Sequence, residues 1–407
     1  YVGGINEADM QRIDKRDYAG TSLIGKIALE RRYEDDLHGN VGHEAVLVNA
    51  RGRIMQSLNA EAAAAGKDLI LTLDIESQLT AHRALAGRRG AVVAIDPNNG
   101  EVLVFASEPS FDPNRISIGM SRADYLAVQQ DPDLPLFNRA LQGAYPPGST
   151  IKPVLALAAL HYEVIDPNQP VYCAGSYSLP GSTHRYRDWK RGGHGWIDMH
   201  GSIEQSCDVY YYELARELGI DRMESFLKRF GLGGATGIDV AGEKTGLVPG
   251  RDWKRHAFSK RADQVWFPGE TLITGIGQGY LLTTPLQLAH MTATIANRGR
   301  RFRPTLLRGT SDPATGAVEF VEPVPLESVG IVRDDQWEQI ISAMSAVLQG
   351  PRGTARAVGI DAPFTPAGKS GTAQALTVAQ DQEYDTEELD ERMRDHARFL
   401  ALAPPRT

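Results

Sequence analysis

Residues 145 to 160 read Y-P-P-G-S-T-I-K-P-V-L-A-L-A-A-L, a turn followed at once by an almost wholly apolar run. The two prolines and the glycine end any preceding helix, and the apolar run predicts a buried helix over 151–164. Because residues three apart share one face of a helix, Ser149 and Lys152 present their side chains to the same point. The stretch therefore predicts a serine and a lysine held together at the start of a core helix.

This pair has the chemistry of a nucleophile and its base. A serine hydroxyl needs a base to become reactive, and burial among apolar side chains favours the neutral, proton-accepting form of Lys152. The free N–H groups and the positive dipole end of the helix stabilise negative charge that develops at Ser149. A second Ser-x-x-Lys pair, Ser225 and Lys228, lies in a charged amphipathic stretch without the preceding turn, and we expect it to be a coincidence.

Ser-x-x-Lys chemistry calls for two further elements, a Ser-x-Asn triplet or a relative of it and then Lys-Thr/Ser-Gly. Ser206-Cys207-Asp208 is a variant of the first. In this interpretation Ser206 passes protons between Lys152 and the leaving amine, and Asp208 holds the pair in place.

Two stretches compete for the third element. The literal Lys244-Thr245-Gly246 runs into a turn, whereas Lys369-Ser370-Gly371-Thr372 opens a strand of small residues expected over 369–376. Small residues let a peptide lie along the strand edge, so we favour the second stretch, with Ser370, Gly371 and Thr372 in contact with substrate. Lys369 then holds a substrate carboxylate, and the N–H groups of Thr372 and Ser149 form an oxyanion hole.

The rest of the chain predicts an α+β fold. A strand at 67–74, a helix at 75–87 and a hairpin at 91–107 begin an antiparallel sheet. More helices are expected at 209–218, 285–297 and 335–349, and more strands at 301–308, 317–321 and 398–403. Helices grouped between the first and last strands of one sheet make an α+β domain. We expect residues 1–66 to form a supporting domain and residues 67–407 the catalytic one.

Composition narrows the class of partner. The 407 residues, 42% of them hydrophobic, allow two or three domains. Lys and Arg number 43 against 51 Asp and Glu and are scattered, so a nucleic-acid surface is not indicated and a small-molecule or peptide substrate fits better. No apolar run approaches the roughly 18 residues of a membrane helix, so we expect any signal or anchor to precede Tyr1.

Four residues between the first two elements are candidate metal ligands: Cys173, Asp188, His194 and Cys207. Two thiolates, a nitrogen and an oxygen suit a closed tetrahedral zinc site. The spacing matches no standard zinc finger, and a Cys173–Cys207 disulfide or two unrelated buried thiols are the alternatives.

Y-P-P-G-S-T-I-K-P, S-C-D and G-K-S-G-T-A-Q, in this order, resemble the class B penicillin-binding proteins, the D,D-transpeptidases that crosslink peptidoglycan. Residues 25–39 (G-K-I-A-L-E-R-R-Y-E-D-D-L-H-G) are similar to the pedestal motif of these proteins. Residues 185–195 (R-Y-R-D-W-K-R-G-G-H-G) and 275–289 (G-I-G-Q-G-Y-L-L-T-T-P-L-Q-L-A) resemble the elongation-specific penicillin-binding protein 2 group. The resemblance covers nearly the whole chain.

The resemblance implies a penicillin-binding/serine-β-lactamase-like transpeptidase domain, an antiparallel sheet flanked by helices, on an N-terminal pedestal. It further implies that the membrane anchor, the start of the pedestal, and a C-terminal strand and helix lie outside the printed sequence. Its implied activity is acyl transfer from peptidoglycan stem peptides through Ser149 during cell elongation, without a cofactor for catalysis and with inhibition by β-lactams. The implied location is the bacterial inner membrane with a periplasmic catalytic domain, and the implied partners are a RodA-type glycosyltransferase and MreC.

Some relatives of this group carry zinc on residues matching Asp188, His194 and Cys207, with a carboxylate where Cys173 stands, and this favours a structural zinc. Two other functions remain as alternatives. A β-lactamase or D,D-carboxypeptidase would use the same three elements and give the acyl group to water. A penicillin-binding sensor would not catalyse a reaction.

Overall fold

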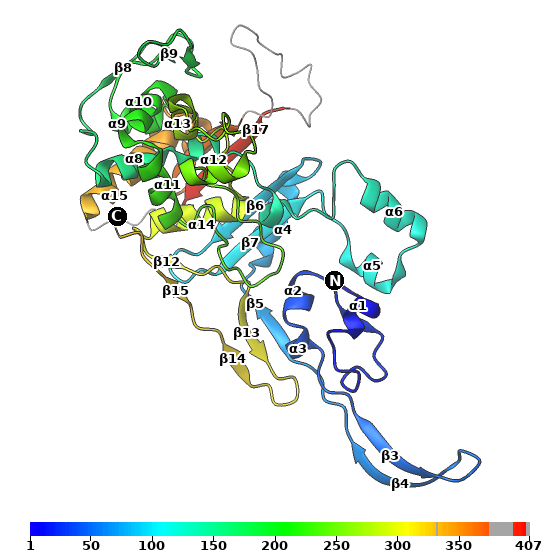
Figure 1. The fold of residues 1–407 in the computed structure, drawn as a ribbon. Helices are drawn as coiled ribbons and strands as arrows, with labels where there is room; N and C mark the ends of the chain where they lie inside the picture. Colours follow the sequence, from blue (N-terminus) through cyan, green and yellow to red (C-terminus); the bar gives the residue numbers. More distant parts are fainter. Residues whose placement is uncertain (331–332, 374–393, 404–407) are drawn as a thin grey trace.

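The computed structural model describes residues 1–330, 333–373 and 394–403. Small N-terminal elements and a projecting hairpin adjoin a larger body that combines helices with antiparallel strands (Figure 1). The α+β class expected from the sequence is confirmed. Within the described ranges no helix is both long and apolar enough to cross a membrane.

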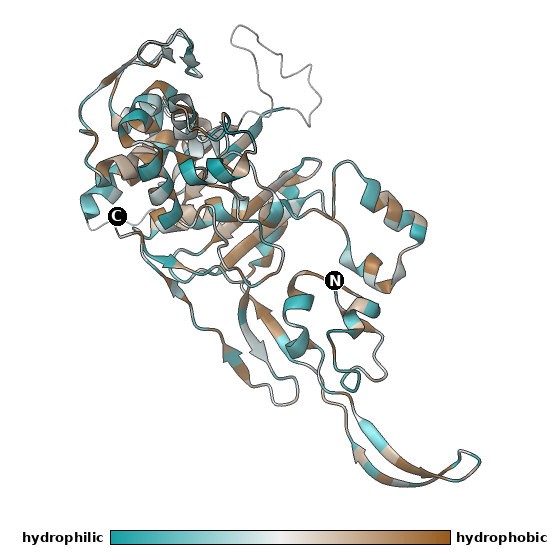
Figure 2. Cartoon of the chain, viewed as in Figure 1, coloured by the Kyte–Doolittle hydropathy of each residue, from teal (hydrophilic) through white to brown (hydrophobic). Residues whose placement is uncertain are grey.

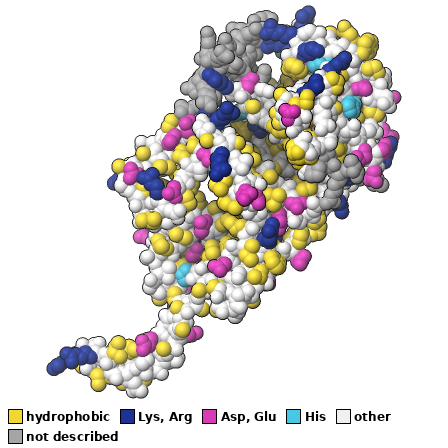
Figure 3. Space-filling model, turned by 180° about the vertical axis from the view of Figure 1, so that it is seen from behind, with side chains coloured by type: hydrophobic (Ala, Val, Ile, Leu, Met, Phe, Trp, Pro, Cys, Tyr) yellow, Lys and Arg dark blue, Asp and Glu magenta, His cyan; other side chains and the backbone are white. Residues whose placement is uncertain are grey.

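The N-terminal part consists of short elements and one long hairpin. In chain order these are β1 (Val2–Gly4), α1 (Glu7–Met10), β2 (Leu23–Gly25), α2 (Ala28–Arg32), α3 (Glu34–Leu37), β3 (His43–Val48) and β4 (Ile54–Glu61). β1 pairs with β2 and β3 pairs with β4, both antiparallel. The β3–β4 hairpin projects from the molecule, and every residue of β4 is exposed (Figures 1 and 3). A hydrogen bond of 2.6 Å from Tyr33 to Asp239 fastens this part to the larger body.

The larger body begins with strands and ends with strands. Its first elements are β5 (Asp68–Leu71), α4 (Ile75–Leu85), β6 (Gly90–Ile95), β7 (Val102–Glu108), α5 (Pro113–Gly119), α6 (Arg122–Gln130) and α7 (Arg139–Gln142). The site elements follow: the 3₁₀ turn η1 (Gly148–Ile151), α8 (Lys152–His161), β8 (Val171–Cys173), β9 (Ser176–Tyr177), β10 (Tyr186–Arg187), β11 (Gly195–Ile197), α9 (Met199–Glu204) and α10 (Asp208–Leu218).

The remaining elements complete the helical layer and return to strands. They are α11 (Ile220–Arg229), α12 (Arg251–Ala257), α13 (Pro268–Gly275), α14 (Pro285–Ala296), β12 (Arg301–Phe302), β13 (Leu307–Ser311), β14 (Val318–Phe320), β15 (Pro325–Leu326), α15 (Asp334–Gln349), α16 (Arg356–Gly359), β16 (Ala367–Ala373) and β17 (His396–Leu402). The helices expected at 209–218, 285–297 and 335–349 are thus confirmed as α10, α14 and α15. Residues 374–376 of the expected strand at 369–376 lie outside the described residues.

The described strands form separate antiparallel groups where one continuous sheet was expected. The main ones are the pairs β6–β7 and β16–β17 and the three-stranded group β14-β13-β5. Between β6 and β17 lies a cavity of about 2070 Å³ that α14 also lines. Sequence alternation predicts that a strand exists, but the neighbour to which it bonds is set by tertiary packing, which leaves no local pattern.

The core forms around α8. All residues from Lys152 to Leu160 are buried, and the helix packs against α10, α11 and α15. Each fully buried Val or Leu side chain contributes about 1.5–3 kcal/mol relative to an exposed one. Figure 2 shows apolar residues on the central strands and helices, and also along the exposed β3–β4 hairpin. Because α8 is packed against α10, α11 and α15, it holds Lys152 and the preceding turn η1, which carries Ser149, in a fixed place.

Candidate active site

The serine of the first motif lies in a turn held by backbone contacts. Ser149 is half-buried in η1, and Lys152 begins α8 one turn later. Gly148 has φ of +57°, a left-handed conformation that favours glycine, and its N–H donates to the Gly277 carbonyl at 2.8 Å. A Cβ on Gly148 would lie 2.5 Å from the carbonyl oxygen of Thr372. The close approach explains why a glycine must precede Ser149.

The amine of Lys152 lies in a completely buried polar nest. It is 2.8 Å from Asp208 Oδ1, 2.8 Å from the carbonyl oxygen of Ser206 and 3.4 Å from Ser206 Oγ. The Tyr211 ring lies below, with its centroid 5.2 Å from the amine. Sequence reasoning expected an apolar surrounding with Asp208 as a support, and the structure adds a direct ion pair between Lys152 and Asp208.

The Ser-Cys-Asp triplet is bent toward Lys152 by an unusual backbone conformation. Ser206 has φ of +57°, which is uncommon for a residue with a side chain, and α10 begins directly after Cys207. The Asp208 carboxylate lies at the helix start, where the dipole favours negative charge. Its Oδ2 accepts the backbone N–H of Trp189 at 3.1 Å, so both of its oxygens have partners.

The third element runs along β16, beside η1. Ser370 is half-buried, with its Oγ 2.7 Å from that of Thr354, and Thr372 is exposed. A Cβ on Gly371 would lie 2.8 Å from Thr150 Cγ2, so only glycine lets the strand approach the serine turn this closely. Residues Ser149, Lys152, Ser206, Asp208 and Ser370 to Thr372 thus come from three distant stretches into one neighbourhood.

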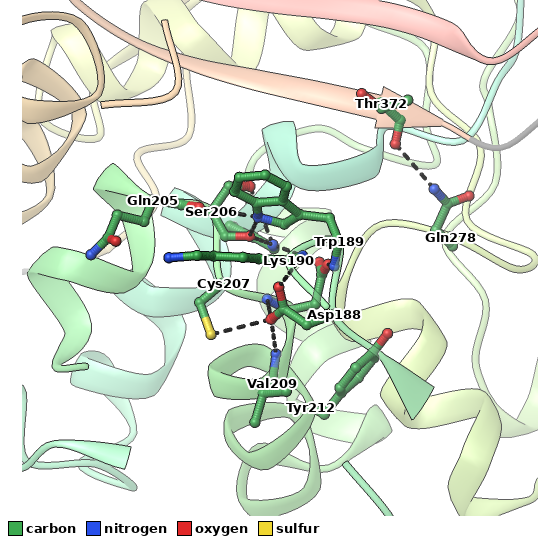
Figure 4. Close-up of polar contacts among 12 residues, drawn as sticks. Asp188, Trp189, Lys190, Gln205, Ser206, Cys207, Val209, Tyr212, Gln278 and Thr372 are labelled. Carbon is green, nitrogen blue, oxygen red and sulfur yellow. Dashed lines mark hydrogen bonds and ion pairs between the residues drawn. The ribbon is translucent and has the colours of Figure 1, made fainter. Parts of the chain in front are cut away.

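Gln278 occupies the outward edge of this strand. Its side-chain amide donates to the carbonyl oxygen of Thr372 at 3.2 Å (Figure 4). In an antiparallel strand the N–H and C=O of one residue point to the same side. The N–H of Thr372 therefore also points away from β17, toward the serine turn, as an oxyanion hole requires.

Lys369 is fully buried, and its amine donates to the Ser370 carbonyl at 2.9 Å. Burial and then the positive charge of Lys152 lower the pKa of Lys369 well below its ordinary value, and Asp208 partly offsets them. The charges of both Lys152 and Asp208 act on the amine, so Lys369 belongs to the same buried group as the Lys152 amine. Its expected contact with a substrate carboxylate stays a prediction.

The four candidate metal ligands do meet. One ligand atom from each of Cys173, Asp188, His194 and Cys207 lies within 4.8 Å of all the others. Asp188 Oδ2 is 3.5 Å from the Cys173 sulfur and 3.4 Å from the Cys207 sulfur, and His194 Nδ1 is 3.5 Å from the Cys173 sulfur. Tetrahedral zinc with bonds of about 2.0–2.3 Å places its ligands roughly 3.3–3.8 Å apart, so the spacing fits.

The electrostatics of the cluster also fit a cation. Burial and then the Asp188 carboxylate raise the pKa of the Cys207 thiol, so gathering these groups without a positive charge is unfavourable. Burial lowers the pKa of His194, whose Nε2 is enclosed without a hydrogen-bond partner among the described residues. Both cysteines are free, buried thiols in this structure, and they lie in one cluster.

The competing sequence motifs lie elsewhere. Ser225 and Lys228 are exposed on α11, and Lys228 pairs with Glu224 at 2.6 Å. Lys244 and Thr245 belong to no strand, and the Thr245 carbonyl accepts from Gln287. Neither stretch reaches the serine turn by any described contact.

Sequence reasoning missed Trp189, Gln278 and Thr354. The indole N–H of Trp189 lies 3.1 Å from the Ser206 carbonyl and 3.2 Å from that of Gln205 (Figure 4). These contacts join residues far apart in the chain, so they leave no spacing pattern. For Trp189 a weak signal existed, because it directly follows the metal-ligand candidate Asp188.

Comparison with known proteins identifies the family. The penicillin-binding protein transpeptidase domain matches residues 90–405, and the penicillin-binding protein dimerisation domain matches residues 1–71. The chain belongs to the penicillin-binding protein transpeptidase family. The peptidoglycan D,D-transpeptidase MrdA of Acinetobacter baumannii is 44% identical over 405 residues, which cover 99% of this chain and 59% of that protein. The chain spans 59 to 65% of the length of the curated MrdA relatives.

Solved structures agree with the family. Pseudomonas aeruginosa PBP2 in complex with WCK 5153 has 42% sequence identity and a TM-score of 0.83, with 100% of this chain and 80% of that chain covered. The Helicobacter pylori PBP2 complex with MreC has 30% identity and a TM-score of 0.84, with 99% of this chain and 70% of that chain covered. These matches establish a PBP2-like fold.

Proposed function

We propose that the chain is the extracytoplasmic part of an elongation-specific peptidoglycan D,D-transpeptidase that β-lactams acylate. The observation that carries the proposal is the buried Lys152 amine, bound to Asp208 and Ser206, on the residue that directly follows the turn of Ser149, with β16 alongside. The similarity to MrdA supports the same reaction. A carboxypeptidase would use the same groups but transfer the acyl group to water. Sustained turnover of a β-lactam would distinguish it from a transpeptidase.

The first step forms the acyl-enzyme. A neutral amine has two N–H donors and one lone pair, so donation to Asp208 and to the Ser206 carbonyl leaves the lone pair for the Ser149 proton. Ser149 Oγ attacks the carbonyl carbon of the penultimate D-Ala, and its proton passes to Lys152. Backbone N–H groups of Ser149 and Thr372 stabilise the oxyanion. The C–N bond then breaks, and the departing D-Ala amine takes the proton through the Ser206 hydroxyl.

The second step reverses the roles of the same groups. The amine of a neighbouring stem peptide attacks the acyl carbon and gives a proton through Ser206 to Lys152. The ester bond to Ser149 breaks, and Lys152 returns the proton to Oγ. Asp208 stabilises the lysine whenever it carries the proton, because the two groups lie 2.8 Å apart. No cofactor is needed for either step.

Ligand recognition is assigned to β16. A donor peptide adds along the outer edge of the strand, where Thr372 is exposed, and Ser370 and Thr372 offer hydroxyls to its carboxylate. Lys369 keeps its role toward that carboxylate, and the charges of Lys152 and Asp208 act on its buried amine. A carboxylate entering the site would favour the charged form of Lys369 and so be bound more tightly.

A structural zinc is the second part of the proposal. Cys173, Asp188, His194 and Cys207 would hold it, and its charge would offset the gathered thiols and carboxylate. Asp188 Oδ2 also accepts the backbone N–H groups of Asp208 at 2.7 Å and Val209 at 3.1 Å. One hydrogen bond therefore joins the cluster to Asp208, the partner of Lys152. The proposed zinc would fix the part of the chain that carries the cluster and Asp208.

We infer the cellular context of the enzyme from its similarity to the family. We assign residues 1–66 to the non-catalytic pedestal and residues 67–407 to the transpeptidase domain. The whole protein is placed at the bacterial inner membrane, with this part in the periplasm. MreC is the proposed partner because a PBP2 has been solved with it, and a RodA-type glycosyltransferase follows from the resemblance.

Intact-mass spectrometry after penicillin treatment tests the activity, followed by mapping of the modified peptide. We expect one adduct, on Ser149, and none in Ser149→Ala. Nitrocefin should give a burst equal to the protein concentration without sustained turnover. An adduct on Ser225, or continuous hydrolysis, would contradict the proposal. A functional Ser149→Ala variant in cells would instead support a non-catalytic sensor.

Metal analysis of unreduced protein tests the zinc. We expect one zinc per chain and its loss in Cys207→Ser. Removal of the metal by a chelator should lower the melting temperature and slow the acylation of Ser149. A metal-free protein with full stability would contradict the assignment.

A further inference from the structure

Trp189 makes three hydrogen bonds to the turn that carries Ser206 and Asp208. Its backbone N–H donates to Asp208 Oδ2 at 3.1 Å. Its indole N–H is shared between the carbonyls of Gln205, at 3.2 Å, and Ser206, at 3.1 Å. Figure 4 shows the indole lying across this turn. Trp189 as a whole is 59% exposed, so the residue faces solvent although both of its N–H groups bond to the turn.

Trp189 and Lys152 bind the same two groups. The Lys152 amine donates to Asp208 Oδ1, and the backbone N–H of Trp189 donates to Asp208 Oδ2. The Lys152 amine and the Trp189 indole N–H both donate to the Ser206 carbonyl. The two donors together therefore fix the carbonyl and the carboxylate. With either one missing, each acceptor is free to turn about its backbone or side-chain bond.

The conformation of Ser206 makes such fixing necessary. Its φ of +57° lies in the left-handed region, which costs roughly 1–2 kcal/mol for a residue with a Cβ. Such a conformation persists only where the surroundings over-determine it. The Ser206 carbonyl supplies that constraint, because it accepts from both the Lys152 amine and the Trp189 indole. If the turn relaxed, the oxygen atoms that hold the Lys152 amine would move.

We infer that Trp189 is a positioning residue that sets the place of the Lys152 amine relative to Ser149. It acts through the Ser206 carbonyl and the Asp208 carboxylate and touches no reacting atom. The part of Trp189 that matters is its indole N–H, since a packing role would need only the ring. The inference rests on the proposed function, because the place of the amine matters only if Lys152 handles the Ser149 proton.

The test removes the N–H and keeps the shape. Trp189 is replaced by 3-benzothienylalanine, in which sulfur stands for the indole N–H, and separately by phenylalanine. Trp196→Phe is the matched control, because Trp196 lies nearby in the chain, is 71% exposed and only meets the edge of the Tyr172 ring. Stopped-flow acylation with a fluorescent penicillin separates the binding constant from the acylation rate constant. Melting temperature and metal content are measured on every variant.

We expect both Trp189 variants to acylate about five- to tenfold more slowly, with the binding constant, melting temperature and metal content of the benzothienyl variant unchanged. The Trp196→Phe variant should match the wild type. A benzothienyl variant that acylates at the wild-type rate would overturn the inference and leave the proposed function standing. A loss of rate that follows a loss of metal would also overturn it, since the role would then be loop stability. Failure of the wild type to acylate at Ser149 would instead refute the proposed function.

Discussion

Lys152 and Asp208 form an ion pair with an N–O distance of 2.8 Å in which the lysine side chain is 0% and the aspartate 12% exposed. Burying two charges costs desolvation that the attraction only partly repays, and apolar replacements of such pairs are often neutral or stabilising. The presence of this pair is therefore better explained by a role in the reaction than by a contribution to the free energy of unfolding. Removing one partner alone leaves an unpaired buried charge, which is costly.

Asp208→Asn keeps the shape of the side chain and removes its charge. We expect the acylation rate to fall about 100-fold or more, because the lysine loses the group that stabilises its protonated form. The free energy of unfolding should fall by about 3–5 kcal/mol, the usual result of breaking a buried pair. Fluorescent-penicillin kinetics and urea denaturation measure the two effects. The control is Lys228→Met on the surface copy of the motif, and equal kinetics for both variants would refute the role of Asp208.

Gly148→Ala should disrupt the serine turn. The new Cβ would lie 2.5 Å from the Thr372 carbonyl oxygen, and φ of +57° adds strain. We expect at least a tenfold loss of acylation rate and a lower melting temperature. Gly181→Ala is the control, because Gly181 has a similar φ of +76° but no heavy atom within 4 Å of the added Cβ. Gly181→Ala introduces backbone strain without a close contact. Equal effects at both positions would show that the contact with the Thr372 carbonyl does not matter.

Gln278→Ala should leave the Thr372 carbonyl free to accept a hydrogen bond from a ligand. The amide of Gln278 holds the Thr372 carbonyl at 3.2 Å, and a bound peptide amide must displace it. We expect penicillins, which carry an acylamino N–H, to bind about two- to tenfold more tightly to the variant. Carbapenems lack that N–H and should bind as before. Weaker binding of both classes would show that Gln278 contacts ligands directly.

Stability should depend on pH through His290, which lies buried in α14. Burial and then the charge of Arg301 lower the pKa of His290 to about 4. The unfolded chain takes up this proton near pH 6.5, so the unfolded state binds more protons between these values and stability falls as the pH falls from about 6.5 to 4. The full loss is about 3 kcal/mol.

His290→Gln should flatten this dependence. Urea denaturation between pH 4.5 and 7.5 measures it, with His200→Gln, at an exposed position, as the control. The free energy of unfolding of the wild type minus that of His290→Gln should become smaller as the pH falls across this range. An equal pH dependence in the two proteins would contradict the assignment.

Features with a local or periodic signature were readable in the sequence. The apolar run after Lys152 required a buried helix, and the small residues after Lys369 separated it from the literal motif at Lys244. Contacts between distant residues were not readable, because they leave no spacing. Gln278 and Thr372 are 94 residues apart, and the indole of Trp189 reaches Ser206 only through the folded loop. The burial of Lys369 likewise depends on packing that no local pattern encodes.

The backbones of Gly277, Gly148 and Thr372 lie in close contact. A Cβ on Gly277 would lie 2.1 Å from the Gly148 carbonyl oxygen. This contact leaves little room for drug resistance to arise at the centre of the site, because a substitution at either glycine would damage the proposed crosslinking activity along with the proposed capture of β-lactams. Escape from an inhibitor is therefore expected at the rim, where an exposed side chain can change without moving the serine.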